Sequence, residues 1–172
     1  FRGATLPSFR PEMTRALRLD FAEVDRRCKA VDQRLAGAQG AKINFVVGGK
    51  MHEMYVDLRH RKAIVGSGII PAVGPHKKIG NLPGGETFIV PYEGEKPGDP
   101  SRTSGIMPVQ YGDEIILYRL ENNQVVEILS QGPFSDKERA RIHTEKAAYN
   151  LAELGFGILQ SMNVAPLVGP ED

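Results

Sequence analysis

The sequence has few of the features that mark secreted, membrane-spanning or nucleic-acid-binding proteins. Cys28 is the only cysteine among 172 residues, which excludes an internal disulfide and a multi-cysteine zinc site and predicts a reducing, cytoplasmic location. The longest apolar runs, such as 115–117, are far shorter than the ~20 residues that cross a bilayer, so no membrane partner is expected. Lysine and arginine number 22 against 21 acidic residues, which argues against a nucleic-acid partner.

Several common catalytic motifs are also missing. The histidines are scattered, and none forms the His-x-x-x-His or His-x-Asp spacing that places two metal ligands on one face; His52 and His60 share a strand face only without an intervening bulge. No Ser, His and Asp set is recognisable as a hydrolytic triad. The glycines at 66–68 and 84–85 match neither a P-loop nor a dinucleotide-binding fingerprint. We therefore assign no metal ligand among the four histidines, which are His52, His60, His76 and His143.

Length and composition predict a compact protein. The strand-like alternation, turn residues and helical stripes described below predict the α+β class, with an antiparallel or mixed sheet and flanking helices. Residues 1–19 contain two prolines and little periodicity, so we expect an N-terminal arm followed by a single domain over 20–172. The chain opens with Phe1 and has no secretory signal, so we expect an internal fragment, a processed chain or a region numbered from its first observed residue.

The first predicted helix begins after Asp20. Apolar residues then recur at helical spacing through Leu35, and Glu23 completes a sequence typical of a capping box. Gly37 is expected to follow the end of the helix. Cys28 falls on the apolar stripe, which predicts a small buried side chain rather than a nucleophile.

Period-two alternation predicts most of the sheet. Residues 43–47 and 54–58 are expected to form a hairpin around Gly48 and Gly49. Residues 115–120 and 124–129 flank an asparagine-rich turn and form the clearest predicted hairpin. Shorter strands are expected at 63–65 and 87–90, with either long ordered loops or a functional lid over 66–85.

A second helix is predicted over 135–154. Ser135 and Glu138 have the spacing of a capping box, and Gly155 would follow as the left-handed C′ residue. Glu153 would then lie in the last turn, where a carboxylate is disfavoured by ~0.3–1 kcal/mol unless a cation is near. The alternative is a solvated surface side chain, for which this penalty is small.

Glu86 is the other carboxylate with an unusual position. The segment 81–86 places it on a tight Gly-Gly turn immediately before an apolar strand. A rigid strand end can hold a ligand oxygen within the narrow tolerance that a metal requires. The alternative is that Glu86 is a solvated turn residue and that the glycines only permit the bend.

The segment 80–91 closely resembles the Asn-x-Pro-x-Gly-Glu-x-Phe-x-x-Pro motif of the thermophilic-type metal-dependent aminopeptidases, the aminopeptidase T and S family, which includes leucyl aminopeptidase-like enzymes. Residues 152–157 also look like this family, and the resemblance extends over about 20–157. It implies an aminopeptidase T-like catalytic domain that lacks the N-terminal domain and the C-terminal end. In that family two glutamates bind the metal, and they map onto Glu86 and Glu153.

This resemblance implies a hydrolase that removes N-terminal residues from peptides with divalent zinc, cobalt or manganese. It also implies a peptide or small-molecule substrate and a homodimer. Glu86 and Glu153 would be catalytic as well as metal-binding, with their carboxylates within roughly 4–8 Å so that they can address a metal pair. The family completes its site with histidines and a His-x-Asp pair further along the chain, and this sequence ends at Asp172 before any such element. The resemblance therefore predicts an incomplete metal site.

Two other functions remain open from the sequence. The same motif occurs in the 2,5-dihydroxypyridine dioxygenase branch, which cleaves rings with non-haem iron. In that case Glu86 and Glu153 would be scaffold residues. The third reading is a non-catalytic binding or scaffold domain with the same fold.

Overall fold

A computed structural model describes residues 3–7, 9–70 and 79–159. The chain separates into two compact units, and several segments of the sequence contribute to each. The first unit contains Phe1–Ala36, Ala63–Phe88 and Gly155–Asp172, and the second contains Gly37–Lys62 and Ile89–Leu154. Both units combine helix with sheet, so the predicted α+β class is confirmed. The division into an arm over 1–19 and one domain over 20–172 stays a prediction.

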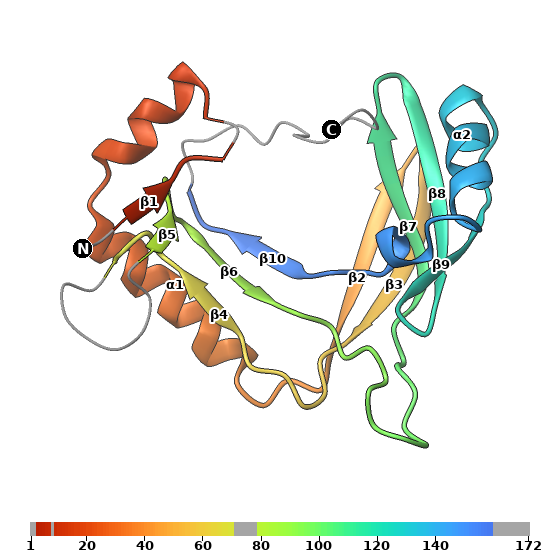
Figure 1. The fold of residues 1–172 in the computed structure, drawn as a ribbon, viewed down its shortest axis with the longest axis horizontal. Helices are drawn as coiled ribbons and strands as arrows, with labels where there is room; N and C mark the ends of the chain where they lie inside the picture. The colour runs from red at the N-terminus through yellow and green to blue at the C-terminus, as the bar shows by residue number, and fades with distance from the viewer. Residues whose placement is uncertain (1–2, 8, 71–78, 160–172) are drawn as a thin grey trace. The chain divides into compact units, whose positions relative to one another are not determined.

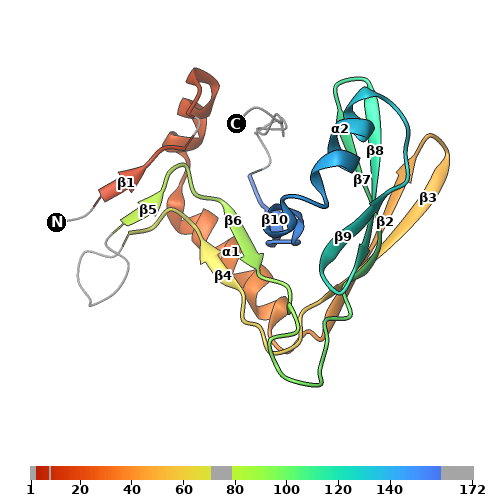
Figure 2. The same cartoon turned by 45° about the vertical axis from the view of Figure 1, so that its right-hand side comes forward.

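The first unit consists of one long helix, a short 3-10 helix and two small sheets (Figure 1). In the larger sheet the strand order is β10-β6-β4, and in the smaller one β1 pairs in parallel with β5. Helix α1 lies along β4 and β6 in both cartoon views (Figure 2). The elements are β1 (Gly3–Thr5), η1 (Pro11–Arg18), α1 (Phe21–Leu35), β4 (Ile64–Gly66), β5 (Ile79–Asn81), β6 (Glu86–Ile89) and β10 (Leu154–Gly157).

Helix α1 confirms the first predicted helix. The Asp20 side chain accepts a hydrogen bond of 2.9 Å from the Ala22 amide, and an N-cap of this kind stabilises a helix by about 1 kcal/mol. Glu23 does not complete the expected capping box, and its carboxylate instead pairs with Arg26 and Arg27. Cys28 lies on the buried side of α1 and is 0% exposed, as predicted.

The second unit is built on a five-stranded antiparallel sheet with the order β2-β3-β7-β8-β9 (Figure 1). Both predicted hairpins are confirmed, β2 with β3 and β8 with β9. Gly48 and Gly49 have φ of 55° and 75°, and Asn122 and Asn123 have φ of 50° and 69°, as tight hairpin turns require. The strands are β2 (Gly40–Val47), β3 (Lys50–Asp57), β7 (Ser104–Tyr111), β8 (Glu114–Glu121) and β9 (Gln124–Ile128).

The core of the second unit lies between β8, β9 and the helical segments that follow them. Ile116 and Ile128 pack there with Ile142 and Tyr149, all of them buried. Helix α2 (Pro133–Arg141) and the 3-10 helix η2 (Lys146–Tyr149) cover this part of the sheet. None of the helices in the described part of the chain has the length and apolar character needed to cross a membrane.

The predicted helix over 135–154 is wrong. Helix α2 starts earlier because Pro133 occupies its first turn, so Ser135 lies inside the helix instead of capping it. The cap comes from β8, where the Glu114 carboxylate accepts hydrogen bonds from the Phe134 and Ser135 amides at 3.0 and 2.8 Å. The Ser135 hydroxyl also donates to this carboxylate, and it lowers the pKa of Glu114 more than the two amides do.

The second half of that segment is not an α-helix either. After α2 the chain forms the short η2, then runs without helix through 150–153 and enters β10. Gly155 therefore belongs to a strand and is not the C′ residue of a helix. Hydrogen bonds from the turn between β8 and β9 to residues 150 and 151 compete with helix formation there.

Candidate functional site

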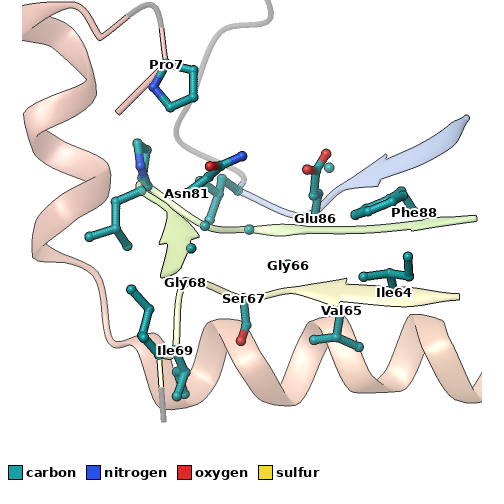
Figure 3. Close-up of a pocket in the computed structure, with 18 of the residues that line it drawn as sticks. Pro7, Ile64, Val65, Gly66, Ser67, Gly68, Ile69, Asn81, Glu86 and Phe88 are labelled. Atoms are coloured by element: carbon teal, nitrogen blue, oxygen red, sulfur yellow. The ribbon is translucent and has the colours of Figure 1, made fainter. Parts of the chain in front are cut away.

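The first unit contains a cavity of about 680 Å³ beside the strand β6 (Figure 3). Its walls come from β4 and the residues after it, from β5 and the turn that leads to β6, and from the end of β10. Most of the lining side chains are apolar, and Glu86 is the carboxylate among the lining residues. The apolar wall includes Ile64, Ile69, Ile70, Leu82, Pro83 and Phe88.

Strand β6 directs Glu86 toward this cavity. Successive side chains of a strand point to opposite faces, and Thr87 and Ile89 are fully buried. The Thr87 hydroxyl donates to the Cys28 carbonyl of α1 at 2.8 Å, which fixes this face of β6 against the helix. Glu86 and Phe88 therefore take the other face, where Figure 3 shows both side chains on the cavity side of the sheet.

Glycines flank Glu86 on both neighbouring strands. Gly66 of β4 is its register partner, and a Cβ there would lie only 3.2 Å from the Glu86 Cγ. Gly155 belongs to β10, the other neighbour of β6, and a Cβ there would lie 3.8 Å from the Glu86 Oε2. The space beside the carboxylate is thus kept clear of side chains from the adjacent strands, which makes it accessible to a ligand.

The turn before Glu86 is packed too closely to accept larger residues. A Cβ on Gly84 would approach the backbone nitrogen of Gly68 to 2.1 Å, and Gly85 has a φ of 145°. The Gly85 amide also donates to the Gly66 carbonyl at 2.8 Å. These contacts explain why glycine is required at positions 84 and 85. They also fix the backbone that enters β6 and carries Glu86.

The groups behind β6 are engaged in the packing of α1. The Cys28 thiol lies 3.3 Å from the Glu86 carbonyl oxygen, and burial raises the pKa of this thiol, so it is no nucleophile. Ser67 donates to Asp25 at 2.7 Å, and Figure 3 shows its side chain on the α1 side of the sheet. Hydrogen bonds from Lys29 and Ser67 lower the pKa of Asp25, which is thus committed to this contact.

Glu153 belongs to the second unit, where it is exposed and directly precedes β10. Glu153 is not in a helix, so the predicted unfavourable interaction with a helix dipole does not occur. The helix dipole therefore gives no reason to expect a cation at Glu153. Glu86 and Glu153 lie in different units, so the expected 4–8 Å between their carboxylates stays a prediction.

Glu86 does not form a metal centre with other described residues. Across 3–7, 9–70 and 79–159, no three His, Cys, Asp or Glu side chains gather as a metal site would require. Zinc usually takes three or four protein ligands, so the described donors do not fit a complete zinc site. His76 lies outside the described residues.

Sequence reasoning missed the glycines that matter most at Glu86. Gly66 was judged only against phosphate-binding motifs, and Gly155 was placed at a helix end. Their role depends on strand register, which pairs residues far apart in the chain. A glycine within a strand pattern is the one local signal, since it often marks a close approach of another group.

The fold resembles that of a known metal aminopeptidase. No family model and no curated protein sequence matches the chain. Among solved structures, wild-type AmpT from Thermus thermophilus, a metal aminopeptidase, matches with a TM-score of 0.55 and 18% sequence identity. The match covers 80% of this chain and 34% of the AmpT chain, so the chain spans about a third of that protein's length. At this identity the likeness shows the fold alone, which is aminopeptidase-like.

Proposed function

We propose that this chain is part of a metal-dependent aminopeptidase that removes N-terminal residues from peptides, with Glu86 as a carboxylate of the active site. The observation that carries the proposal is the setting of Glu86 in a cavity of about 680 Å³, between the glycines of two adjacent strands. An accessible carboxylate on a rigid strand end is suited to holding a cation. The likeness of the fold to AmpT supports an aminopeptidase over other hydrolases.

The apolar wall of the cavity favours a peptide substrate whose first residue has an apolar side chain. Ile64 and Phe88 line the cavity beside Glu86, and Leu82 contributes from the turn before β6. Burying a leucine-sized side chain against such a surface stabilises a complex by about 1.5–3 kcal/mol. In this arrangement the apolar side chain of the first residue occupies the wall, and the peptide amino end lies near Glu86.

The cation proposed for Glu86 is a divalent metal, with zinc, cobalt and manganese as the candidates. Glu153 is proposed as a further metal ligand of the full-length protein. Because the described residues supply too few donors, further ligands must come from residues outside 3–7, 9–70 and 79–159, either in this chain or in the rest of the full-length protein. The two carboxylates are therefore proposed only as metal ligands. No described side chain is assigned a further role in hydrolysis.

Metal binding by the full-length protein tests this proposal. Equilibrium dialysis against zinc, cobalt or manganese, followed by elemental analysis, should give at least one bound ion per chain. Glu86→Gln should weaken binding at least tenfold, whereas Glu93→Gln, which changes an exposed carboxylate of the second unit, should leave it unchanged. Equal binding by wild type and Glu86→Gln would refute the role of Glu86, and stoichiometric iron would favour the ring-cleaving alternative.

A further inference from the structure

Asn123 combines features that are unusual for a residue in a hairpin turn. It lies between β8 and β9, has a φ of 69° and is 0% exposed, whereas its neighbour Asn122, with a φ of 50°, is exposed. Positive φ explains asparagine at both positions but does not explain why one of the two is fully buried. The Asn123 side chain therefore has a function beyond the turn.

The contacts of Asn123 fix the chain at Asn150 and Leu151. Its Nδ2 donates to the Asn150 Oδ1 and to the Leu151 carbonyl, both at 3.0 Å. Its backbone carbonyl accepts a bond of 2.9 Å from the Leu151 amide. Both backbone polar groups of Leu151 are thus bound by this one asparagine. The Asn123 amide in turn donates to the Thr103 carbonyl at 3.2 Å, so the turn itself is fixed to the chain just before β7.

The segment held in this way leads directly to Glu153. Only Ala152 separates Leu151 from Glu153, and the chain has no helix or turn between them. Two residues of extended chain span at most about 7 Å, so fixing Leu151 strongly restricts where the Glu153 backbone can lie. Ala152 and Glu153 are both exposed.

We propose that Asn123 is a positioning residue that binds the Asn150 side chain and the Leu151 backbone and thereby orients Glu153 for its function. This inference rests on the role proposed for Glu153. A carboxylate that binds a metal must be held within a few tenths of an ångström, and residues outside the ligand set supply that restraint. Asn123 supplies it from a hairpin that belongs to the rigid sheet of the second unit.

Paired glycine variants of the full-length protein separate positioning from turn formation. Asn123→Gly keeps the freedom to adopt positive φ and removes the two side-chain hydrogen bonds, and Asn122→Gly is the matched control in the same turn. Hydrogen–deuterium exchange of the Leu151 amide, which donates to the Asn123 carbonyl, should become at least tenfold faster in Asn123→Gly than in Asn122→Gly. Equal exchange in the two variants would overturn the proposal.

A double-mutant cycle tests whether Asn123 acts through Glu153. For release of an N-terminal residue from a peptide, Asn123→Gly should lower kcat at least tenfold with KM changed less than twofold, and Asn122→Gly should change neither. The double variant Asn123→Gly, Glu153→Gln should have a kcat no lower than that of Glu153→Gln alone, because Asn123 then no longer positions a carboxylate. Independent, multiplicative effects would overturn the positioning role. If the wild type releases no amino acid, the proposed aminopeptidase activity fails, and the exchange comparison alone decides whether Asn123 restrains this segment.

Discussion

The setting of Glu86 between two glycines predicts that one added methyl group will impair function without impairing folding. The change is Gly155→Ala in β10. Its Cβ would meet one atom within 4 Å, the Glu86 Oε2 at 3.8 Å, which is an ordinary van der Waals distance. Replacing glycine by alanine at an unstrained position stabilises a protein by ~0.4–1 kcal/mol through the unfolded state. The free energy of unfolding should therefore rise slightly or stay unchanged.

The same methyl group should weaken cation binding by Glu86. It occupies the space beside Oε2, where a bound cation and the groups around it would otherwise lie. Displacing one contact between the charged carboxylate and a bound ligand costs ~1.5–3 kcal/mol, which corresponds to about a 10- to 100-fold loss of affinity. Gly157→Ala is the control, because Gly157 lines the same cavity and its added Cβ would have no neighbour within 4 Å.

Two measurements on the full-length protein decide between these expectations. Urea unfolding should give equal or higher stability for Gly155→Ala, and metal dialysis should show at least tenfold weaker binding than in Gly157→Ala. Equal binding in the two variants would refute the idea that the glycines keep Glu86 accessible. A loss of several kcal/mol in Gly155→Ala would show instead that the glycine is needed for packing.

Three further predictions concern folding and electrostatics. Leu120→Ala, at a core position that is 1% exposed, should lower the free energy of unfolding by about 2–5 kcal/mol in urea titrations, and a change below 1 kcal/mol would contradict its place in the core. Arg26, followed by Arg27, lowers the pKa of Glu23 to about 2, so the stabilising charge is fully present above the ordinary pKa of 4.5 and is lost as the pH falls toward 2. The stability difference between wild type and Glu23→Gln should therefore shrink over that range, and a difference that stays constant from neutral pH down to pH 2 would contradict the ion pairs. The buried Cys28 should react with a thiol reagent far more slowly in the native protein than in urea, and equal rates would contradict its burial.

The elements that sequence reasoning predicted correctly are those whose signals are local. Helix α1 has its cap at Asp20 and its apolar stripe within fifteen residues, and both hairpins carry their turn residues between their own strands. The helix after β9 was predicted wrongly because its limits depend on distant residues. Glu114 caps α2 from β8, and Asn123 binds the backbone at Leu151 that the periodic pattern had assigned to the helix.

Strand β7 was not predicted, and its composition explains why. Gly105 and Pro108 interrupt the alternation that marks a strand. In the structure Gly105 allows close contact with β3, since a Cβ there would lie 2.3 Å from the Glu53 carbonyl oxygen. Pro108 lies beyond the two residues of β7 that pair with β3, so its missing amide does not interrupt that pairing.

The candidate site was predictable only in part. The Gly-Gly turn and the following apolar strand placed Glu86 at a strand entrance, and the structure has it there, facing a cavity. The surrounding glycines and the apolar wall come from β4, β5 and β10, and the pairing of these strands cannot be read from local patterns. For Glu153, the sequence argument rested on a helix that does not form, and its proposed role now rests on the family resemblance.

The most direct test of the central claim is the release of free N-terminal amino acids from peptides by the purified full-length protein. The assay compares wild type, Glu86→Gln and the surface control Glu93→Gln with leucine-initiated and aspartate-initiated peptides, in the presence of zinc, cobalt or manganese. The account predicts that wild type and Glu93→Gln release leucine faster than aspartate and that Glu86→Gln loses at least a hundredfold in kcat/KM. Release by Glu86→Gln at the wild-type rate would contradict it.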